Sequence, residues 1–591
     1  MSTLPTSCYE FGSFRLDASR SLLLRDGEQV PVSPKALETL LLLVSEAGRV
    51  LRKEEFIARI WPDCFVEEQN LTQYIFTLRK ALGEAPNDHR YIVTVPGQGY
   101  RFVAPVRELA ETDDAQAKGA RTGEARAPEE SVAPAASIAV LPFKMLGGDQ
   151  VDDFLGPGLA DALITRLGGV GQISVCSTSA VLRYINSDRS PLAAGHELGV
   201  ETVLDGHLQR SGERIRLTVQ LFRLSDGKTL WAEKFDEKFT DVFSVQDSIS
   251  EQVVRALVRK LTDEELQSLT KRHTGDAEAF QAYIRGRYFW NRRTAEGLHK
   301  AIGYFEQAIA IDPAYALAFV GLADAYNLLA GHGGLHPQET FPKAKAAAER
   351  ALEIDGSLAE AFASLGFVSY RFDWNWSDSE RHFKRAIAMK PNYATAHHWY
   401  GESLAAAGRF DDSLAELGRA QELDPLSLPI NTDLGQSLYF ARRYEEAAVQ
   451  LEKTLEMDAD FPRALIILSA VYEQQGRYME AIELACRAVK LSQANPLALS
   501  GLGHARALAG QHHEARRIVS DLRRLAANRY VSSYNIALVY AGLGEHSAAL
   551  DYLEEAVGNS DVWLVWLKFN PRLDILCDDP RFIALTRRVN L

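Results

Sequence analysis

The sequence predicts a multidomain fold: a small α+β domain that ends in a β-hairpin, a central α/β domain, and an all-α solenoid. Three observations support this prediction. The chain has 591 residues, more than the ~250–300 that one core usually serves. A helix with an unusual polar face precedes a two-stranded pattern near residue 100, and a 34-residue period runs through the second half. The elements are taken below in chain order.

The stretch from Asn70 to Leu82 has the pattern of an amphipathic helix. Four leucine and isoleucine residues recur on its apolar face: Leu71, Ile75, Leu78 and Leu82. The opposite face combines amides, hydroxyls and a cation without any acid. Amides and hydroxyls suit base edges in a major groove, and a lysine suits a phosphate. We expect DNA contacts from Asn70, Gln73, Tyr74, Phe76, Thr77 and Lys80.

A β-hairpin is expected after this helix. Tyr91–Val95 alternates like a strand, Pro96–Gly99 supplies turn residues, and Tyr100–Val103 returns as a second strand. A short helix followed by such a hairpin is the arrangement of a winged helix-turn-helix. Arg79 on the helix and Arg101 on the returning strand are further candidate DNA contacts.

Several of these candidates have a structural alternative. Arg79 either touches a phosphate or forms an internal salt bridge, and Arg101 makes either a phosphate or a structural contact. Tyr74 and Phe76 are alternatively packing residues.

Residues 1–106 carry 12 Lys and Arg against 13 Asp and Glu, whereas a protein that binds DNA without sequence preference is basic throughout. We therefore expect weak sequence-independent binding that relies on dimerisation or on a partner.

Residues 9–106 resemble the winged-helix effector domain of the OmpR/PhoB family, in the sub-pattern of CadC- and ToxR-like regulators. The matching blocks follow in order: Tyr9 to Val32, Pro34 to Leu40, Gly48 to Val50, Arg52 to Trp61, Leu78 to Leu82, and Gly97 to Phe102. The chain departs from the family at Thr77 and Pro96, where arginine is frequent, and this leaves the target sequence open. The resemblance implies a domain that binds double-stranded DNA as a head-to-tail homodimer.

The loop from Pro62 to Gln69 is longer than the turn of a simple helix-turn-helix. In the OmpR/PhoB family this loop faces a neighbouring protomer or RNA polymerase. The resemblance therefore makes three acidic residues candidate polymerase contacts: Asp63, Glu67 and Glu68. The alternative, to which we give equal weight, is a solvated loop.

The distribution of cysteines and apolar runs predicts a cytoplasmic protein without membrane contact. Five cysteines stand apart, with no CxxC pair and no histidine at zinc spacing. The start of the chain lacks the pattern of a signal peptide, and no run approaches the ~18 apolar residues of a membrane helix. Residues 107–136 are rich in Ala, Glu, Asp and Arg, which predicts a flexible linker. No cofactor or metal site is expected.

A second domain is expected over residues 137–262. Its pattern is a strand at Ser137–Phe143, a helix at Asp153–Leu167, further strands, and a closing helix from Val242 to Leu261. This pattern is similar to the TolB-amino-terminal-like module. Gly227-Lys228-Thr229 imitates the end of a phosphate-binding loop, but residue 222 is a phenylalanine where that loop needs glycine. We interpret it as a hairpin turn. The sequence shows no set of residues arranged for catalysis, so we expect that the protein is not an enzyme.

The region 276–591 is self-similar. One series of turn residues recurs every 34 residues: Gly408, Arg442, Gly476, Gly510 and Gly544. A second series marks close helix contacts: Gly366, Gly401, Gly435, Ser469 and Gly503. A 34-residue helix-turn-helix period with such small residues indicates tetratricopeptide repeats. About eight repeats would complete a superhelical turn and form a concave groove for a protein or peptide, with a cap at the carboxyl end.

Two residue clusters in the repeats each have a functional and a structural interpretation. His397-His398 and His512-His513 suggest a metal, but neighbours on a helix point about 100° apart, so we expect them on the surface. The tryptophans near one repeat junction could line a ligand pocket, although core packing is favoured: Trp374, Trp376 and Trp399.

The sequence as a whole predicts a soluble bacterial transcription regulator. Its winged helix reads promoter DNA, while the TolB-like and repeat regions collect a signal from a protein, a peptide or a small ligand. The alternative is a repeat scaffold whose winged helix mediates protein contact. A third class, an enzyme such as a nucleotide cyclase with similar accessory regions, lacks a catalytic domain here.

Overall fold

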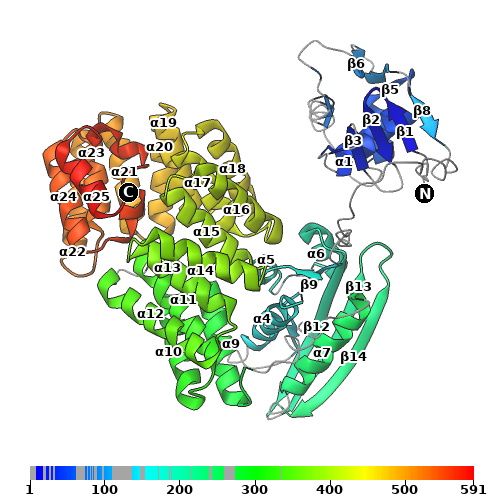
Figure 1. The fold of residues 1–591 in the computed structure, drawn as a ribbon, viewed down its shortest axis with the longest axis horizontal. Helices are drawn as coiled ribbons and strands as arrows, with labels where there is room; N and C mark the ends of the chain where they lie inside the picture. The colour runs from blue at the N-terminus through cyan, green and yellow to red at the C-terminus, as the bar shows by residue number, and fades with distance from the viewer. Residues whose placement is uncertain are drawn as a thin grey trace, which may run out of the picture. The chain divides into compact units, whose positions relative to one another are not determined.

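The computed structural model divides into two compact units, residues 1–130 and residues 131–591 (Figure 1). It describes residues 8–17, 22–25, 28–30, 34–60, 74–75, 78–79, 82, 84, 90–95, 99–104, 106–109, 136–146, 153–170, 172–185, 187, 189–212, 214–238, 242–258, 273–332 and 335–591. Each unit has a hydrophobic core of its own.

The first unit begins with an antiparallel sheet in the order β4-β3-β2-β1-β8. Its strands are β1 (Cys8–Phe11), β2 (Phe14–Asp17), β3 (Leu22–Arg25), β4 (Glu28–Gln29) and β8 (Arg107–Leu109). Helices α1 (Pro34–Ser45) and α2 (Lys53–Ile60) follow the strands β1 to β4. Phe11, Phe14 and Phe102 are buried, and Phe11 meets Phe102 edge to face with ring centroids 5.1 Å apart. The strands at the two ends of the domain therefore share one core.

The predicted wing is confirmed as a β-hairpin with narrower bounds. Strands β6 (Ile92–Val95) and β7 (Gly99–Phe102) pair antiparallel, and β5 (Val50–Arg52) joins β7 on its other edge. Gly99 has a φ of +149°, and a Cβ built on it would lie 2.0 Å from the Leu51 carbonyl oxygen. Only glycine fits this position, because the wing and β5 approach backbone to backbone.

The second unit opens with a six-stranded mixed sheet in the order β11-β9-β12-β13-β14, with β10 paired to β12. The strands are β9 (Ala136–Val140), β10 (Lys144–Met145), β11 (Ile173–Val175), β12 (Thr202–Ser211), β13 (Arg214–Arg223) and β14 (Thr229–Lys238). The helices are α4 (Leu155–Leu167), α5 (Thr178–Leu182), α6 (Pro191–Leu198) and α7 (Val242–Leu257). Figure 1 shows the long β12–β14 strands with α7 running along them. The expected α/β pattern is confirmed. Helices α5 and α6, both short, were not predicted from the sequence.

The Gly227-Lys228-Thr229 segment belongs to the turn between β13 and β14. Gly227 has a φ of +66°, and the Lys228 ammonium pairs with Asp226 at 3.2 Å. The hairpin-turn interpretation is therefore confirmed. Among the residues that the structure describes, no helix is long and apolar enough to cross a membrane.

Eight helix pairs form the repeats, from α9–α10 to α23–α24. Their bounds are α9 (Ala277–Asn291), α10 (Ala295–Ile311), α11 (Ala316–His332), α12 (Pro337–Ile354), α13 (Ala359–Arg371), α14 (Trp376–Met389), α15 (Ala394–Ala406), α16 (Phe410–Leu423), α17 (Leu428–Phe440), α18 (Tyr444–Met457), α19 (Pro462–Gln474), α20 (Tyr478–Leu491), α21 (Pro496–Leu508), α22 (His512–Ala526), α23 (Ser533–Gly542) and α24 (His546–Gly558). A Cβ on Gly435 would lie 2.6 Å from Leu451, so the paired helices require small residues there.

The superhelix closes on itself after these eight pairs. The Gln338 side-chain amide at the start of α12 donates to the Gly558 carbonyl oxygen at 3.4 Å, and the His336 and Tyr530 rings lie 4.8 Å apart. Short helices η3 (Val562–Trp566), η4 (Pro571–Leu576) and α25 (Pro580–Arg588) follow the last pair. The expected full superhelical turn is therefore present.

Candidate functional site

The predicted DNA-reading helix is described only in part. Tyr74, Ile75, Leu78 and Arg79 are helical. Ile75, Leu78 and Leu82 are at most 2% exposed and join the core of the first unit, as the apolar spacing predicts. Tyr74 is half-buried and packs against the same core, in agreement with its alternative packing role.

Arg79 connects this helix to the wing. Its guanidinium donates to the Ile92 carbonyl oxygen at 3.0 Å and to Thr94 Oγ1 at 2.9 Å, and its Nε lies 3.6 Å from the buried carboxylate of Glu84. Glu84 Oε1 in turn accepts from the backbone nitrogens of Tyr91, at 2.5 Å, and Ile92, at 3.1 Å. Of the two roles considered for Arg79, the internal salt bridge is the one present, and it fixes the angle between helix and wing.

Arg101 lies on β7, the central strand of the wing sheet. It is half-buried, opposite Val50 of β5 and Val93 of β6, and its Nε has no hydrogen-bond partner. The other candidates fall outside the described residues. They are the base-facing candidates Asn70, Gln73, Phe76, Thr77 and Lys80, and the loop acids Asp63, Glu67 and Glu68.

In the second unit, the inner surface of the superhelix is covered. The first helix of most pairs is buried on nearly all sides, as in α15, where every residue from Ala396 to Ala406 is buried, while α9 at the start of the repeats is buried only in part. The second helix of a pair keeps an exposed face, as in α16, which buries only Ser413, Leu417, Ala420 and Leu423. The expectation of an open concave groove is therefore wrong for the described repeats. The sequence pattern could not reveal this, because it reports which faces are apolar and not what covers them.

The carboxyl-terminal segment covers one part of this inner surface. The Trp566 ring stacks on Phe440 with centroids 4.5 Å apart, and Phe569 packs against Phe410 and the turn at Gly408. The Asn570 side-chain amide donates to the Tyr534 hydroxyl at 2.8 Å. The predicted carboxyl-terminal cap therefore lies inside the superhelix as well as at its end.

A buried ion pair anchors this segment. Arg572 donates to both carboxylate oxygens of Glu473, at 2.8 and 2.7 Å, and His504 Nδ1 lies 2.8 Å from the same carboxylate. Burial alone would raise the pKa of Glu473, but Arg572 and His504 outweigh it and hold that pKa below its ordinary value. A bidentate arginine–carboxylate pair is among the strongest polar contacts in proteins.

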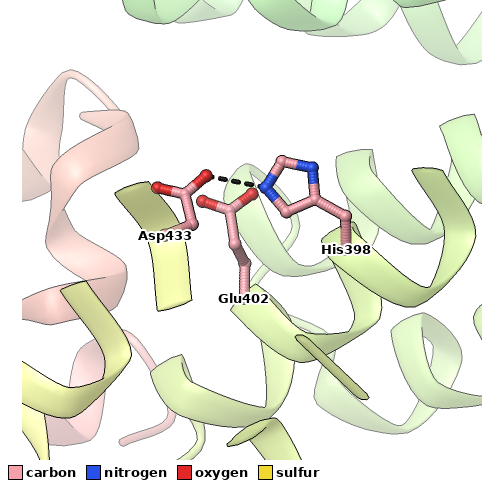
Figure 2. A group of neighbouring side chains, drawn as sticks. All are labelled: His398, Glu402 and Asp433. Carbon is pink, nitrogen blue, oxygen red and sulfur yellow. Dashed lines mark hydrogen bonds and ion pairs between the residues drawn. The ribbon is translucent and has the colours of Figure 1, made fainter. Parts of the chain in front are cut away.

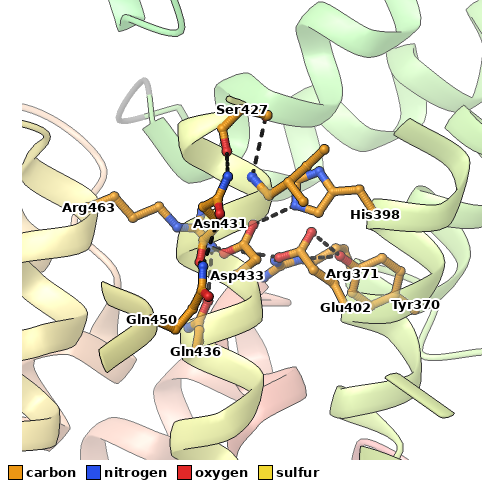
Figure 3. A network of polar contacts seen from close by, with 11 residues as sticks. Tyr370, Arg371, His398, Glu402, Ser427, Asn431, Asp433, Gln436, Gln450 and Arg463 are labelled. Carbon is orange, nitrogen blue, oxygen red and sulfur yellow. Dashed lines mark hydrogen bonds and ion pairs between the residues drawn. The ribbon is translucent and has the colours of Figure 1, made fainter. Parts of the chain in front are cut away.

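A second buried network joins the four inner helices α13, α15, α17 and α19, as Figure 3 shows. Arg371 donates to the Tyr370 hydroxyl at 2.9 Å and to Glu402 at 3.0 Å. Arg463 from α19 donates to Asp433 and, at 2.9 Å, to Gln436. Burial would raise the pKa of Asp433, yet Arg463 and the nearby histidine lower it below its ordinary value. Two cations and two carboxylates thus balance inside the solenoid.

Three members of this network have the composition of a metal site: His398, Glu402 and Asp433 (Figure 2). His398 Nε2 lies 2.7 Å from Asp433 Oδ2. Both carboxylates, however, already pair with Arg371 or Arg463. Arginine cannot deprotonate to make room for a second cation, so the chemistry of the cluster favours a structural ion-pair network over metal coordination.

The surface placement predicted for His397 and His398 is wrong, because their residues are 6% and 8% exposed. His397 Nδ1 lies 2.6 Å from Glu416, and its Nε2 lies 2.9 Å from the Pro391 carbonyl oxygen. Because an inner repeat helix is buried on two sides, His397 and His398 point to different neighbours and each lies beside its own carboxylate, Glu416 or Asp433. His512 and His513 are exposed, as predicted. Trp399 is 2% exposed and packs in the core, also as predicted.

The α/β part of the second unit docks onto the repeats. Arg287 of α9 donates to both oxygens of Asp161 in α4, at 3.0 and 3.3 Å, and Asp161 also accepts from Thr178. Ser179 in α5 donates to Asp424 at 2.6 Å. A Cβ on Gly158 would lie 2.8 Å from the Ile284 side chain, so α4 and α9 are in close contact.

A cavity of about 590 Å³ lies at this junction. Residues of α4, β11 and α5 form one wall, and residues of α9, α11, α13, α15 and α17 form the other. The lining combines apolar and aromatic side chains with several charged groups, a mixture also found in small-molecule sites.

Family comparisons agree with this architecture. Residues 27–102 match the family described as "Transcriptional regulatory protein, C terminal", and residues 134–252 match the "HilA/YgeH-like transcriptional regulator, second domain". Tetratricopeptide repeats match at residues 374–427, 432–496 and 531–560. The family matched in the middle region is thus the HilA/YgeH-like one, and the predicted likeness to a TolB module stays a prediction.

The individual relatives include two transcription regulators and one protein named as an enzyme. The transcriptional regulator HilA of Salmonella typhi is 25% identical over 419 residues, which cover 71% of this chain and 70% of that protein. The transcriptional activator CadC of Escherichia coli (strain K12) is 32% identical over 16% of this chain and 19% of that protein. A Rhizobium meliloti (strain 1021) protein named as an adenylate cyclase is 30% identical over 39% of this chain and 40% of its own length.

These matches define the class of protein. The chain is a DNA-binding transcription regulator that combines an OmpR/PhoB-type winged helix, a HilA/YgeH-like second domain and tetratricopeptide repeats. The repeats indicate protein interaction as part of that role.

Proposed function

We propose that this regulator reads promoter DNA through the first unit and receives its signal through the second. The observation that carries the proposal is the match of residues 27–102 to transcriptional regulatory domains, together with a wing that Arg79 and Glu84 hold at a fixed angle to the reading helix. A rigid helix–wing angle favours simultaneous entry of the helix into a major groove and contact of the wing with the backbone.

We assign distinct roles to the residues of the reading surface. Gln73 and Thr77 contact base edges, and Lys80 contacts a phosphate, with Asn70 and Phe76 beside them. Tyr74 and Arg79 act mainly by supporting this surface, because Tyr74 packs on the core and Arg79 binds the wing. Arg101, on the central strand of the wing sheet, is proposed either to support that sheet or to contact a phosphate.

We further propose two partners beside DNA. The near-neutral charge of residues 1–106 supports binding as a homodimer on repeated half-sites, because one domain gains little from the phosphates alone. The acids Asp63, Glu67 and Glu68 are proposed to contact RNA polymerase.

The second unit is proposed as a signal receiver in the cytoplasm and not as an enzyme. We divide the chain into a DNA-binding domain (1–106), a linker (107–136), an α/β domain (137–262) and the repeats (276–591). The first residues of that linker, Arg107–Leu109, form strand β8 and pair with β1, so the DNA-binding domain extends to Leu109. A protein partner binds the exposed second helices of the repeats, or it displaces the carboxyl-terminal segment from the inner surface. The likeness to a protein named as a cyclase covers 40% of that protein, and no catalytic constellation accompanies it here.

The test is selection from random duplex DNA by the full-length protein and by the double variant Gln73→Ala/Thr77→Ala. A Ser13→Ala variant in the exposed β1–β2 turn is the matched control. Enrichment of one motif by the wild type and the control, with loss in the double variant, is expected. Selection of no motif by the wild type would contradict the proposal.

The second candidate function is a repeat scaffold whose winged helix contacts protein. The acidic balance of the whole chain, 79 Asp and Glu against 65 Lys and Arg, favours it. In that case the same selection would give only weak, salt-sensitive binding without a motif.

A further inference from the structure

The cavity at the junction of the α/β domain and the repeats has the size of a ligand site. Small-molecule pockets span roughly 300–1,000 Å³, and this one is about 590 Å³. Its walls come from segments far apart in sequence: Ser179 of α5 and Asp424 both line it, are 245 residues apart and are hydrogen-bonded. An occupant would therefore touch both halves of the second unit at once.

One cation in this cavity lacks a counter-ion. Arg293 lies in the turn after α9 with a φ of +53°, and its guanidinium stacks on the Trp290 ring at 3.7 Å. No carboxylate or carbonyl oxygen of the described chain accepts a hydrogen bond from that guanidinium. Burial lowers the pKa of Arg293 to about 10, which reflects an under-solvated positive charge. The neighbouring Arg287, by contrast, is neutralised by Asp161.

Two buried carboxylates of the cavity lining, Asp324 and Asp424, form no ion pair among the described residues, and Asp324 is on the same side of the cavity lining as the repeats that carry Arg293. Asp324 on α11 is 2% exposed and accepts a hydrogen bond from Ser364, and no lysine or arginine of the described chain lies within ion-pair distance. Burial raises the pKa of Asp324 to about 6. The other acid–base pair of this wall, Lys390 and Glu360, is satisfied at 2.9 Å. Arg293 and Asp324 line the same cavity and each shifts the pKa of the other, although they form no ion pair.

The rest of the lining is suited to a short organic stem. Tyr283, Trp290 and Tyr393 present aromatic rings, and Leu317 and Val320 add aliphatic surface. Unpaired opposite charges on a lining with apolar surface between them match a molecule that carries both charges itself. An inorganic anion would satisfy Arg293 alone and leave Asp324 without a partner.

We propose that this cavity binds a small zwitterion of the amino-acid or short-peptide class, with its carboxylate on Arg293 and its ammonium group on Asp324. The proposal deepens the proposed function, because it names the ligand class for the signal-receiving unit. Both anchoring residues lie in the repeats and residues of α5 line the same cavity, so we expect a bound ligand to favour the docked arrangement of the α/β domain on the repeats.

The test measures binding to the full-length protein by thermal shift and calorimetry. The probes are the free L-amino acids and dialanine, each compared with its N-acetyl and its C-amide derivative at millimolar concentration. We expect at least one zwitterion to raise the Tm and both of its blocked derivatives to fail. Failure of every zwitterion, or equal binding of acetate or phosphate, would overturn the proposal.

Variants locate the site. Arg293→Gln and Asp324→Asn are each expected to weaken the zwitterion that binds by about 10-fold or more, because each removes one charge-assisted contact. Arg350→Gln on the exposed face of α12 is the control and leaves binding unchanged. Asp324→Asn is isosteric and removes a buried charge, so a folded variant is expected there. Unchanged binding in both cavity variants would also overturn the proposal.

The ligand-binding test and the DNA-selection test can fail independently of each other. DNA selection uses the first unit and needs no zwitterion. A protein that selects a motif but binds no zwitterion therefore loses only this inference, and a protein that binds a zwitterion without selecting DNA loses only the DNA-reading role.

Discussion

Asp324 shows how one buried carboxylate sets a pH dependence. Its pKa is raised to about 6 in the folded chain by burial, above an unfolded value of about 4. The folded state then binds more protons than the unfolded state between these two values, so its contribution to stability falls as the pH rises from about 4 to 6.

The variant Asp324→Asn tests this sign. Asparagine keeps the acceptor for Ser364 and removes the charge. The Tm of the variant should exceed that of the wild type at pH 7, and the difference should shrink toward zero at pH 4. Melting curves of both proteins across this range measure it. A difference that stays constant, or that grows toward low pH, would contradict the assignment.

At the residue scale the sequence predicts apolar positions well and polar partners poorly. The burial of Ile75, Leu78 and Leu82 follows from helical spacing alone. The surface placement of His397 and His398 was wrong because their partners, Glu416 and Asp433, lie 19 and 35 residues away on other helices. Arg79 had two possible roles, and only the fold brings Glu84 and the wing beside it.

At the element scale, the carboxyl-terminal segment is held by the Arg572–Glu473 pair. Replacement of Arg572 by methionine leaves Glu473 buried without its bidentate donor, which typically costs about 3–5 kcal/mol. We expect faster hydrogen exchange in η4 and in the facing part of α19. The double variant Glu473→Gln/Arg572→Met removes both charges and should recover much of the protection.

Arg442→Ala is the matched control for this element. Arg442 also reaches the carboxyl-terminal segment, at Asp574, but that pair is exposed. Exposed pairs contribute about 0–1 kcal/mol. Equal exchange in Arg572→Met and Arg442→Ala would show that the buried pair does not anchor the segment.

The contact between α4 and α9 gives a second prediction at this scale. Gly158→Ala introduces a Cβ only 2.8 Å from Ile284, so the α/β domain should dock less well and the Tm should fall. Gly303→Ala on α10 has no heavy atom within 4 Å of the new Cβ, and it should raise stability by roughly 0.5–1 kcal/mol through helix propensity. Changes of the same sign in both variants would argue against a close α4–α9 contact.

The sequence predicts these elements better than their arrangement. The repeat helices follow from a 34-residue period, and the wing follows from alternation on both sides of a turn. The filling of the inner surface does not follow, because it depends on contacts such as Arg572 with Glu473, 99 residues apart, and Ser179 with Asp424, 245 residues apart. The cavity lies at such a junction, and for that reason the sequence could not predict it.

At the scale of the whole molecule, the DNA-binding domain and the repeats belong to separate compact units. The first unit has its own core and the matched DNA-binding domain, and the second joins the α/β domain to a closed superhelix. A partner that bound the inner surface where the carboxyl-terminal segment lies would have to displace internal contacts such as Arg572 with Glu473. A signal can thus be expressed as a change in those contacts.

The most direct test of the account compares two dissociation constants for the full-length protein. One is for the duplex motif that selection yields, and the other is for a scrambled duplex of the same composition, both at physiological salt. Specific regulators bind their sites at least about 10³-fold more tightly than other DNA. The account predicts such a ratio for the wild type and a ratio near one for Gln73→Ala/Thr77→Ala, with binding to the scrambled duplex unchanged. A ratio near one for the wild type, or an undiminished ratio in the variant, would contradict it.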